Sequence, residues 1–280
     1  MPELPEVETI ARSLREGRLN EPSILERRIT DVYLLWERTL ATPDPEEFKA
    51  RLIGQVIQDI GRRGKFLIIQ LSPDQHLLFH LRMSGDLILG QVEGPPAPHD
   101  RIILLLDGNL RLSFNDTRKF GRAWLVSDTG PILDSLGPEP LDPSFSAEDL
   151  FSRLQTFHRQ LKPLLMDQTF LAGLGNIYTD EALHIASIHP LRHSDTLTFA
   201  EATRLWQSIR HVLQEGIRLS GASIDWVYRG GEFQNHFRVY KRTGEACPTC
   251  GTSIRKIFVG QRGTHYCPNC QPNPQERVQY

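Results

Sequence analysis

The chain has 280 residues, of which 39% are hydrophobic, so it is long enough for one large domain or two modest ones with buried cores. Its 32 Lys and Arg residues against 34 Asp and Glu residues give a net charge of −2, which by itself argues against a nucleic-acid-binding protein. No apolar run approaches the roughly 18 residues of a membrane span, and the acidic N-terminus lacks the apolar core of a secretory signal. We therefore expect a cytoplasmic protein.

The first six residues contain a candidate nucleophile. If the initiator methionine is removed, Pro2 presents a secondary amine, and an α-amino group has a pKa of about 7.7–8.0, below the about 10.4 of lysine. Such an amine can attack an electrophilic carbon and form an iminium, with the carboxyl of Glu3 beside it as a general acid or base. The alternative is a plain helix start, because Pro5 and the acidic residues around it suit the first turn of a helix. A helix over 5–18 is predicted on either interpretation.

Short apolar runs follow, and their spacing predicts the strands of a sandwich or barrel. The predicted strands cover 29–35, 51–60, 66–71, 76–81, 86–90, 101–106 and 110–114. Residues 43–45 are predicted to be a loop, and 107–109 a hairpin turn. Lys65 lies at the mouth of one strand. The charged loop 115–122 is most simply a solvated turn whose Phe120 folds inward; the alternative is a set of cations for phosphates with an apolar wedge for a base stack.

The second half of the chain has a helical pattern. Residues 137–143 contain three prolines and are predicted to form a linker. Thr198 and Glu201 have the spacing of a capping box, and an apolar stripe follows them. Between these lies the glycine-rich turn 172–178, where Asn176 opens a helix whose first N–H groups could hold an anion. The Gly-Lys-Ser/Thr ending of a Walker loop is missing from this turn.

All the cysteines lie near the C-terminal end of the chain, in two close pairs with sixteen residues between the pairs. They are Cys247, Cys250, Cys267 and Cys270. This spacing predicts a zinc site with four cysteine ligands, and the alternative of two disulfides is disfavoured in a chain without an export signal. Four thiolates fill a tetrahedral shell, so the zinc is expected to be structural.

The region around the cysteines is basic although the whole chain is not. Residues 229–262 contain seven Lys or Arg and two Glu residues, and 7 − 2 gives a local charge of +5. A hairpin is predicted over 255–266, and it carries Arg262, which could reach a phosphate. A basic end on a nearly neutral chain is typical of proteins that bind nucleic acids through one face.

Together these motifs resemble one family, the bacterial formamidopyrimidine-DNA glycosylases of base-excision repair. The matching segments fall in order along nearly the whole chain: 1–9, Lys65 with its strand, 80–85, 98–100, 118–121, 136–140, 162–167, 173–178 and the zinc hairpin. The opening favours this family over its relative endonuclease VIII, which continues differently after Pro-Glu.

The resemblance implies an α+β chain in which DNA lies between two halves. The implied parts are a β-sandwich with an N-terminal helix over 1–136, a linker over 137–143, a helix-two-turns-helix domain over 144–232, a zinc finger over 233–271 and a tail over 272–280. The implied cofactor is one structural Zn²⁺. The implied partner is double-stranded DNA with damaged bases or abasic sites, and the protein is expected to be a monomer on the bacterial nucleoid.

The resemblance also implies a bifunctional glycosylase and abasic-site lyase that removes oxidised purines, namely formamidopyrimidines and 8-oxoguanine. Pro2 would attack C1′ of the damaged nucleotide, with Glu3 as its acid/base partner. Lys65 and Arg262 would contact phosphates and transfer protons during elimination. A base inside a duplex must be flipped out before it can react. After β- and δ-elimination, the expected product is a one-nucleotide gap flanked by phosphates.

Further residues match positions that touch DNA in the family. The wedge that fills the gap left by the flipped base would consist of Met83, Arg118 and Phe120, and Arg118 could also bond the base opposite. The residues matching backbone-gripping positions are His80, His99, Lys162 and Asn176.

The chain departs from the family pattern in three places. Residues 228–234 lie where the family has its lesion-covering loop and are a few residues short, so weaker action on 8-oxoguanine than on ring-opened purines is expected. Phe157 and His158 replace a basic residue that often precedes Lys162, with Arg159 as a substitute. The polar tail through Tyr280 is long and expected to be disordered. Two alternatives remain: an endonuclease VIII-like glycosylase for oxidised pyrimidines, and a non-catalytic zinc protein that binds nucleic acids.

Overall fold

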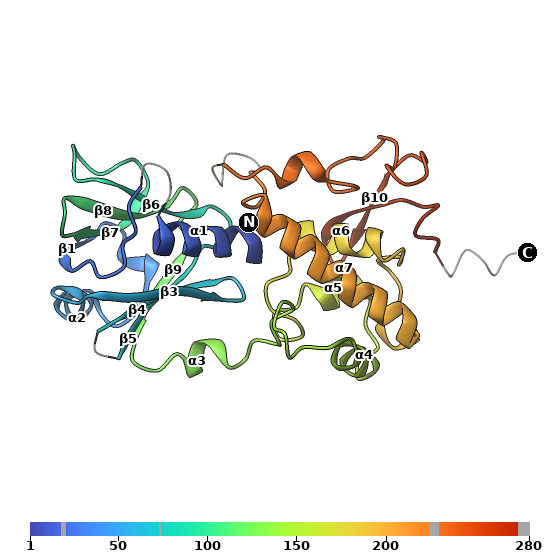
Figure 1. Ribbon diagram of the computed structural model, residues 1–280, viewed down its shortest axis with the longest axis horizontal. Coiled ribbons are helices and arrows are strands. Elements are labelled where there is room, and N and C mark those ends of the chain that lie inside the picture. Colours follow the sequence, from blue (N-terminus) through green and yellow to red (C-terminus); the bar gives the residue numbers. More distant parts are fainter. Residues whose placement is uncertain (18–20, 73, 224–229, 274–280) are drawn as a thin grey trace, which may run out of the picture. The chain divides into compact units, whose positions relative to one another are not determined.

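The chain folds into two compact units, which the computed structural model describes over residues 1–17, 21–72, 74–223 and 230–273 (Figure 1). Unit 1 comprises Met1–Asp134 and Ser220–Gly231, and unit 2 comprises Ser135–Leu219 and Glu232–Tyr280. The predicted boundary at 136 lies beside the end of the first segment of unit 1. Residues 220–231, which the sequence prediction assigns to the helical domain, group with unit 1.

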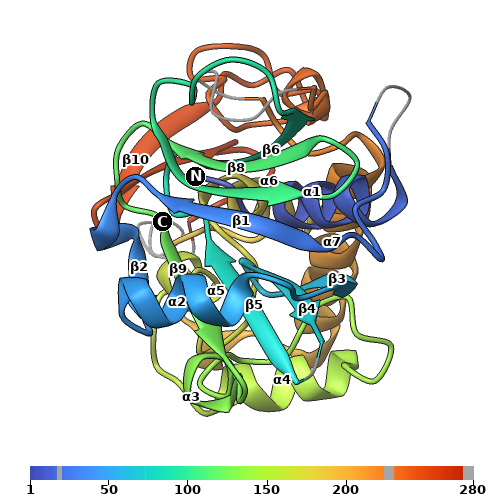
Figure 2. The ribbon, with the colours of Figure 1, turned by 90° about the vertical axis from the view of Figure 1, so that its left-hand side faces the viewer.

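Two β-sheets form most of unit 1 (Figure 2). Their strands are β1 (Ile29–Leu34), β2 (Leu40–Thr42), β3 (Ile57–Arg63), β4 (Phe66–Leu71), β5 (Gln75–His80), β6 (Gly85–Gln91), β7 (Asp100–Leu106), β8 (Leu110–Asp116) and β9 (Arg122–Val126). One sheet has the order β1-β7-β8-β6 and the other β2-β9-β5-β4-β3. Neighbouring strands run antiparallel, except that β2 and β9 are parallel.

One hydrophobic core joins the two sheets. Phe79 of β5 and Phe114 of β8 belong to different sheets, and their ring centroids are 5.1 Å apart. Ile60, Leu104 and Val7 belong to the same cluster and are almost fully shielded from solvent. The unit is therefore the predicted β-sandwich. The alternating apolar side chains of the strands form the core of this sandwich, because each sheet buries one of its two faces.

The first helix, α1 (Leu4–Glu16), packs on β3 and β4. Pro5 suits its first turn, because a helix leaves its first N–H groups unpaired and proline has none to lose. Its buried face is an aliphatic stripe at helical spacing, and each such side chain contributes about 1.5–3 kcal/mol on burial. The stripe is Leu4, Val7, Ile10 and Leu14. The helix ends at Gly17, whose φ of 79° suits glycine. Burial of this stripe fixes the position of Pro2 and Glu3, which directly precede the helix.

The sequence prediction is wrong over the segment before β3. Pro43 and Asp44 lie in an irregular segment as predicted, but Pro45 begins a helix, α2 (Pro45–Leu52), and the strand predicted from 51 begins only at Ile57. Asp44 caps this helix, since its carboxylate accepts hydrogen bonds from the backbone N–H groups of Glu46 and Glu47, both at 3.0 Å. The Pro-Asp-Pro run is thus a cap followed by proline in the first turn.

Unit 2 is mainly helical and ends in a small hairpin. Its larger elements are α4 (Ala147–Gln155), α5 (Leu161–Leu165), α6 (Asn176–Ile185), α7 (Phe199–Arg218), β10 (Arg255–Val259) and β11 (Arg262–Tyr266). Short helices are η1 (Glu37–Thr39) and α3 (Gly130–Leu133) in unit 1, and η2 (Ser194–Thr196) and η3 (Phe233–His236) in unit 2. The predicted capping box is confirmed, because Glu201 N–H donates to Thr198 Oγ1 at 3.3 Å and Thr198 N–H to Glu201 Oε2 at 2.8 Å.

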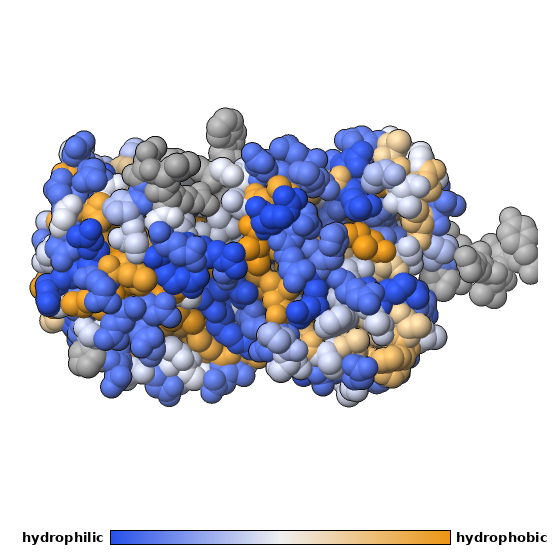
Figure 3. All heavy atoms as spheres, viewed as in Figure 1, coloured by the Kyte–Doolittle hydropathy of each residue, from blue (hydrophilic) through white to orange (hydrophobic). Residues whose placement is uncertain are grey.

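The predicted linker packs within unit 2. Gly137 N–H donates to the carbonyl of Gln168 at 2.8 Å, and Ala172 N–H donates to the carbonyl of Pro138 at 3.0 Å. Hydrophilic residues cover much of the molecular face in Figure 3. Within the described ranges, no helix is long and apolar enough to cross a membrane. The predicted tail lies mostly in 274–280, outside the described residues.

Candidate active site and metal cluster

The predicted nucleophile and its carboxyl partner stand at the buried start of α1. Pro2 is buried, and Glu3 is the N-cap of the helix and only 2% exposed. Glu3 N–H donates to Glu6 Oε2 at 2.8 Å, and the other oxygen of Glu6 accepts from Ala222 N–H at 2.7 Å. Gly221 has a φ of 78°, which favours glycine, and a Cβ there would lie 2.8 Å from Glu6 Oε1. Glu6 thereby attaches residues 221–222 to the helix start.

Lys65 lies in the turn between β3 and β4, also in unit 1. The preceding Gly64 has a φ of 56°, which suits a two-residue hairpin turn, and the lysine is 5% exposed. Arg62, near the end of β3, bonds Glu8 of α1 through Nε and Oε2 at 2.9 Å. Both side chains of this pair are largely shielded from water, so α1 and the strand leading to Lys65 are held together.

His80 ends β5 as a neutral side chain. Its Nδ1 accepts a hydrogen bond from Arg82 N–H at 3.1 Å, which leaves Nε2 to carry the proton. Burial, reinforced by the positive charges of Arg82 and Lys65, lowers the pKa of His80 to about 3. A neutral imidazole here can donate one hydrogen bond without adding charge. The other predicted histidine, His99, is exposed just before β7, with a φ of 77°.

The three predicted wedge residues lie on two turns that share one buried carboxylate. Met83 and Phe120 are 38% and 51% exposed, and the guanidinium of Arg118 lies 5.2 Å from the ring centroid of Phe120. Asp116 accepts hydrogen bonds from Ser84 Oγ, from Arg118 N–H at 3.1 Å and from Gly121 N–H at 2.7 Å. Asp116 is 1% exposed and holds the turn of Met83 beside the turn of the other two. Phe120 points to solvent, against the simple expectation that it folds inward.

Arg262 begins β11 in unit 2 and is exposed. The turn before it, Gly260-Gln261, has φ values of 52° and 62°, the signature of a tight two-residue hairpin. Asn176 Nδ2 donates to the carbonyl of Gly263 at 3.1 Å, so the start of α6 supports the strand that carries the arginine. As predicted, α6 begins at Asn176.

The contacts of Lys162 in the structure differ from the DNA contact predicted for it. Its side chain is 0% exposed, and its Nζ lies 2.5 Å from Asp180 Oδ1 and 3.2 Å from the carbonyl of Gly263. Asp180 also accepts from His265 N–H at 2.9 Å. A shielded ammonium group has no exposed atom with which to contact a phosphate. Lys162 instead ties α5, α6 and β11 together around the residue next to Arg262.

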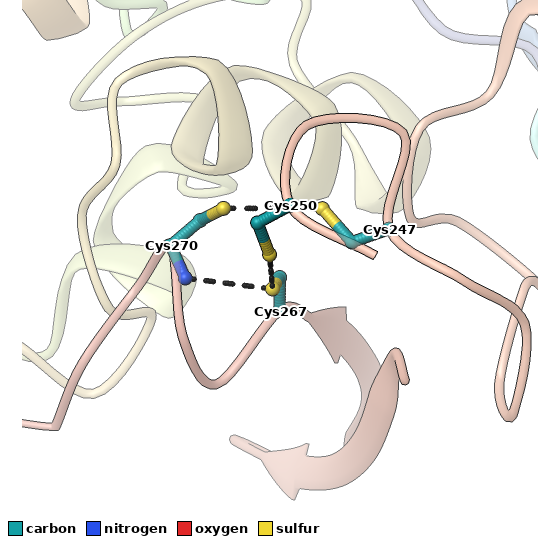
Figure 4. Close-up of side chains that lie close together, drawn as sticks. All are labelled: Cys247, Cys250, Cys267 and Cys270. Atoms are coloured by element: carbon teal, nitrogen blue, oxygen red, sulfur yellow. Dashed lines mark hydrogen bonds between the residues drawn. The ribbon is translucent and has the colours of Figure 1, made fainter. Parts of the chain in front are cut away.

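The four cysteine side chains point toward one another (Figure 4). Cys250 and Cys267 sulfurs are 3.5 Å apart, and those of Cys247 and Cys270 are 3.9 Å apart. These separations are far too long for a disulfide bond, so the disulfide alternative is wrong. Sulfurs at 2.3 Å from a tetrahedral zinc would be about 3.8 Å apart, so the residues fit that ion. His184 Nε2 lies 3.3 Å from Cys247 Sγ, as an outer partner of the ligand shell.

Sequence reasoning missed Glu6, Asp116 and Asp180, three buried carboxylates that organise the predicted site. Each stands inside or next to a recognised motif but accepts hydrogen bonds from distant backbone, over 216 residues for Glu6 and 85 for Asp180. A local signal existed for Asp116, since an aspartate at the end of a strand commonly bonds the following loop.

A β-sandwich headed by a buried Pro-Glu pair, with a helical unit that ends in a four-cysteine hairpin, defines the class of DNA glycosylases with a helix-two-turns-helix domain. The profile of the formamidopyrimidine-DNA glycosylase N-terminal domain matches residues 1–123, and that of the formamidopyrimidine-DNA glycosylase H2TH domain matches 136–227. The profile of the zinc finger found in FPG and IleRS matches 244–273. The chain belongs to the formamidopyrimidine-DNA glycosylase family.

Relatives match along their full lengths. The formamidopyrimidine-DNA glycosylase of Chloroflexus aurantiacus is 46% identical over 99% of this chain and 99% of its own. That of Symbiobacterium thermophilum is 45% identical over 98% of this chain and 90% of its own. Among solved structures, Lactococcus lactis Fpg (MutM) in complex with DNA containing N7-benzyl-Fapy-dG has a TM-score of 0.90 at 38% identity, covering 97% of this chain and 100% of that one. MutM in complex with DNA containing carbocyclic 8-oxo-G has a TM-score of 0.89 with the same identity and coverage.

Proposed function

We propose that this chain is a base-excision repair enzyme, a bifunctional DNA glycosylase and abasic-site lyase for oxidised purines. Full-length similarity to named formamidopyrimidine-DNA glycosylases carries this conclusion. Solved relatives hold DNA with a Fapy-dG, with carbocyclic 8-oxo-G and with an abasic site, which are the proposed substrates. The enzyme would act as a monomer in the bacterial cytoplasm, on the nucleoid.

The first chemical step uses the amine of Pro2 after Met1 has been removed. The nitrogen lone pair forms a bond to C1′, and the bond from C1′ to the damaged base breaks. The base leaves with the electron pair of that bond and takes up a proton, which balances the N–H proton that the attacking amine loses. Glu3 transfers a proton to the sugar ring oxygen as the ring opens, which leaves an iminium between Pro2 and C1′. The buried helix start supports this assignment, because it holds both residues in one place.

The iminium then makes strand cleavage possible. It acidifies the C2′ proton, so a base removes that proton and the C3′–O bond breaks with the phosphate as leaving group. A second elimination breaks the C5′–O bond, and hydrolysis of the iminium frees the enzyme. Lys65 and Arg262 would neutralise phosphates and move protons in these steps. His99, Asn176 and the neutral imidazole of His80 would donate hydrogen bonds to the DNA backbone.

The exposed wedge residues would keep the flipped nucleotide out of the duplex. Unstacking a base costs a few kcal/mol, and side chains that enter the gap offset part of that cost. Met83 and Phe120 offer apolar surface, and Arg118 offers donors for the orphaned base. Their turns are built into unit 1 by Asp116, so the wedge is preorganised.

Zinc in the cysteine cluster would have a structural role. Cys247, Cys250, Cys267 and Cys270 would hold it and leave no coordination position for substrate. Around such an ion these residues would hold together the loop before β10 and the loop after β11, and so fix the hairpin that presents Arg262. We expect one zinc per chain in this cluster.

A panel of lesion duplexes tests the proposed substrate class. Duplexes with a formamidopyrimidine, 8-oxoguanine, thymine glycol or no lesion would be incubated with the purified full chain. We expect cleavage of both purine lesions, faster for the ring-opened one, with phosphates on both sides of the gap. Strong cleavage of thymine glycol without formamidopyrimidine cleavage would instead establish the endonuclease VIII-like alternative. The short lesion-covering loop on which the purine ranking depends includes 228 and 229, which lie outside the described residues.

A further inference from the structure

A second group of metal-binding side chains lies in unit 2, separate from the cysteines. It consists of His158, His193 and Asp195, and one ligand atom from each lies within 4.8 Å of the others. His158 follows α4, whereas the other two belong to the segment of η2, and 37 residues separate His158 from Asp195. Within the described ranges, this is the only such group besides the four cysteines.

Backbone hydrogen bonds build the two halves of this group into one framework. Ser194 N–H donates to the carbonyl of Arg159 at 2.9 Å, and Leu161 N–H donates to the carbonyl of Arg192 at 2.9 Å. Gln160 and His193 form an isolated β-bridge. The hydroxyl of buried Ser194 also bonds the Phe157 carbonyl. The cluster is therefore held by the main chain on both sides and does not depend on side-chain contacts alone.

The side chains themselves are arranged around a shared point. His158 Nδ1 lies 2.8 Å from Asp195 Oδ2, and the rings of His158 and His193 have centroids 4.1 Å apart at an angle of 38°. His193 Nδ1 is shielded from solvent and has no hydrogen-bond partner among the described residues. The three side chains together offer two imidazole nitrogens and one carboxylate oxygen as possible metal ligands in one small space.

We propose that His158, His193 and Asp195 bind a divalent transition-metal ion such as Zn²⁺, as a second metal site of this chain. Two imidazoles and a carboxylate suit Zn²⁺, Co²⁺ or Ni²⁺, whereas Mg²⁺ and Ca²⁺ prefer oxygen ligands only. Ligand atoms at about 2.1 Å from a tetrahedral ion lie about 3.4 Å apart. The His158 side chain is 70% exposed and can rotate to close the observed spacing. Three protein ligands leave a position for water.

The bound ion would join the segment after α4 to the segment before α7. Since it binds the folded chain and not the unfolded one, it would raise the stability of unit 2 by mass action. This effect is independent of the cysteine cluster, whose ligands lie elsewhere in the sequence. It also does not depend on the proposed glycosylase activity.

Titration of the full chain with Zn²⁺ tests this site. The starting protein holds one zinc in the cysteine cluster, and calorimetry measures any further binding. We expect a second equivalent with a Kd in the micromolar range. His193→Gln and Asp195→Asn should each weaken this second binding by at least about tenfold. His211→Gln, which changes an exposed histidine of the same unit outside the cluster, should leave it unchanged.

Co²⁺ gives a second readout that distinguishes the two sites. Added to protein whose cysteine cluster already holds zinc, Co²⁺ should give weak visible absorption typical of nitrogen and oxygen ligands, without the intense near-ultraviolet bands of thiolate ligation. Circular dichroism and one retained zinc would show that each variant is folded. Absence of a second equivalent, thiolate bands, or undiminished binding in the His193→Gln/Asp195→Asn double variant would overturn the proposal.

Discussion

At the scale of single residues, the candidate site depends on buried groups whose charge state the fold controls. His80 is the clearest case, because burial and two neighbouring cations lower its pKa to about 3. It therefore stays neutral throughout the pH range in which the enzyme would act. Both carboxylate oxygens of Glu6 accept hydrogen bonds from backbone N–H groups, one from Glu3 at the helix start and one from Ala222. These residues set the conditions under which Pro2 and Glu3 could react.

The pKa of His80 predicts how stability depends on pH. Well above pH about 6.5 the imidazole is neutral in both the folded and the unfolded chain, so it contributes no pH dependence there. As the pH falls from there toward 3, the unfolded chain binds a proton that the folded chain does not. The free energy of unfolding should therefore decrease, with a contribution of at most about 1.4 kcal/mol per pH unit from this residue.

Urea unfolding at several pH values between 7.5 and 5 measures this contribution. We expect His80→Asn to flatten the decline relative to the wild type, while His211→Asn, at an exposed position, keeps the wild-type slope. Identical slopes for all three proteins would show that His80 binds a proton equally well in the folded and the unfolded chain, which contradicts a lowered pKa in the folded protein.

At the scale of elements, turns and strand ends present the predicted DNA-contacting residues. Sequence patterns predicted some of the elements that carry them and missed others. Apolar runs predicted most of the sandwich strands but not β2 and β9, and the cysteine spacing predicted the metal cluster, because both signals are local. The helix α2 was hidden, since the prolines that begin it are also typical of loops. The internal role of Lys162 could not be predicted, because its partners Asp180 and Gly263 lie 18 and 101 residues away.

Asp116 should govern both wedge turns. In Asp116→Asn, one acceptor oxygen and the negative charge are lost, so at least one of its hydrogen bonds to Ser84, Arg118 and Gly121 fails. An unmet buried donor costs about 1–3 kcal/mol. We expect destabilisation of that size in urea unfolding and weaker binding to a lesion duplex, with little change in binding to undamaged DNA. Asp128→Asn, an exposed aspartate of the same unit, is the control. Equal lesion binding by both variants would contradict the role given to Asp116.

Lys162 should act inside the protein, and salt dependence can show this. A lysine that contacts a phosphate contributes about 0.9 to the slope of log binding constant against log salt concentration. We expect Lys162→Met to keep the wild-type slope, whereas Arg262→Gln lowers it.

Stability gives the complementary measurement for Lys162. Lys162→Met removes the cation beside the buried Asp180 carboxylate, which keeps only its contacts with His265, and this should cost about 3–5 kcal/mol in the free energy of unfolding. The double variant Lys162→Met/Asp180→Asn should recover part of that loss. A reduced salt slope together with unchanged stability would restore the direct DNA contact predicted from the sequence.

At the scale of the whole molecule, catalytic residues from both units are proposed to serve one reaction. The sandwich supplies Pro2, Glu3 and Lys65, and the zinc hairpin supplies Arg262. A chain of net charge −2 can bind DNA because its positive charge is concentrated in the region of the hairpin. We propose that the reaction nonetheless depends on one bond, which would form between the terminal amine of Pro2 and the sugar of the damaged nucleotide.

Borohydride trapping tests that claim most directly. Full-length protein from which Met1 has been removed, verified by intact mass, is incubated with a formamidopyrimidine duplex and sodium borohydride, beside an otherwise identical protein that keeps Met1. Reduction of the iminium should join the first protein to the DNA, with the added mass located on Pro2, while the second gives no adduct and no strand cleavage. Equal cleavage of the lesion duplex by the protein that keeps Met1, or an adduct located on another residue, would contradict this account.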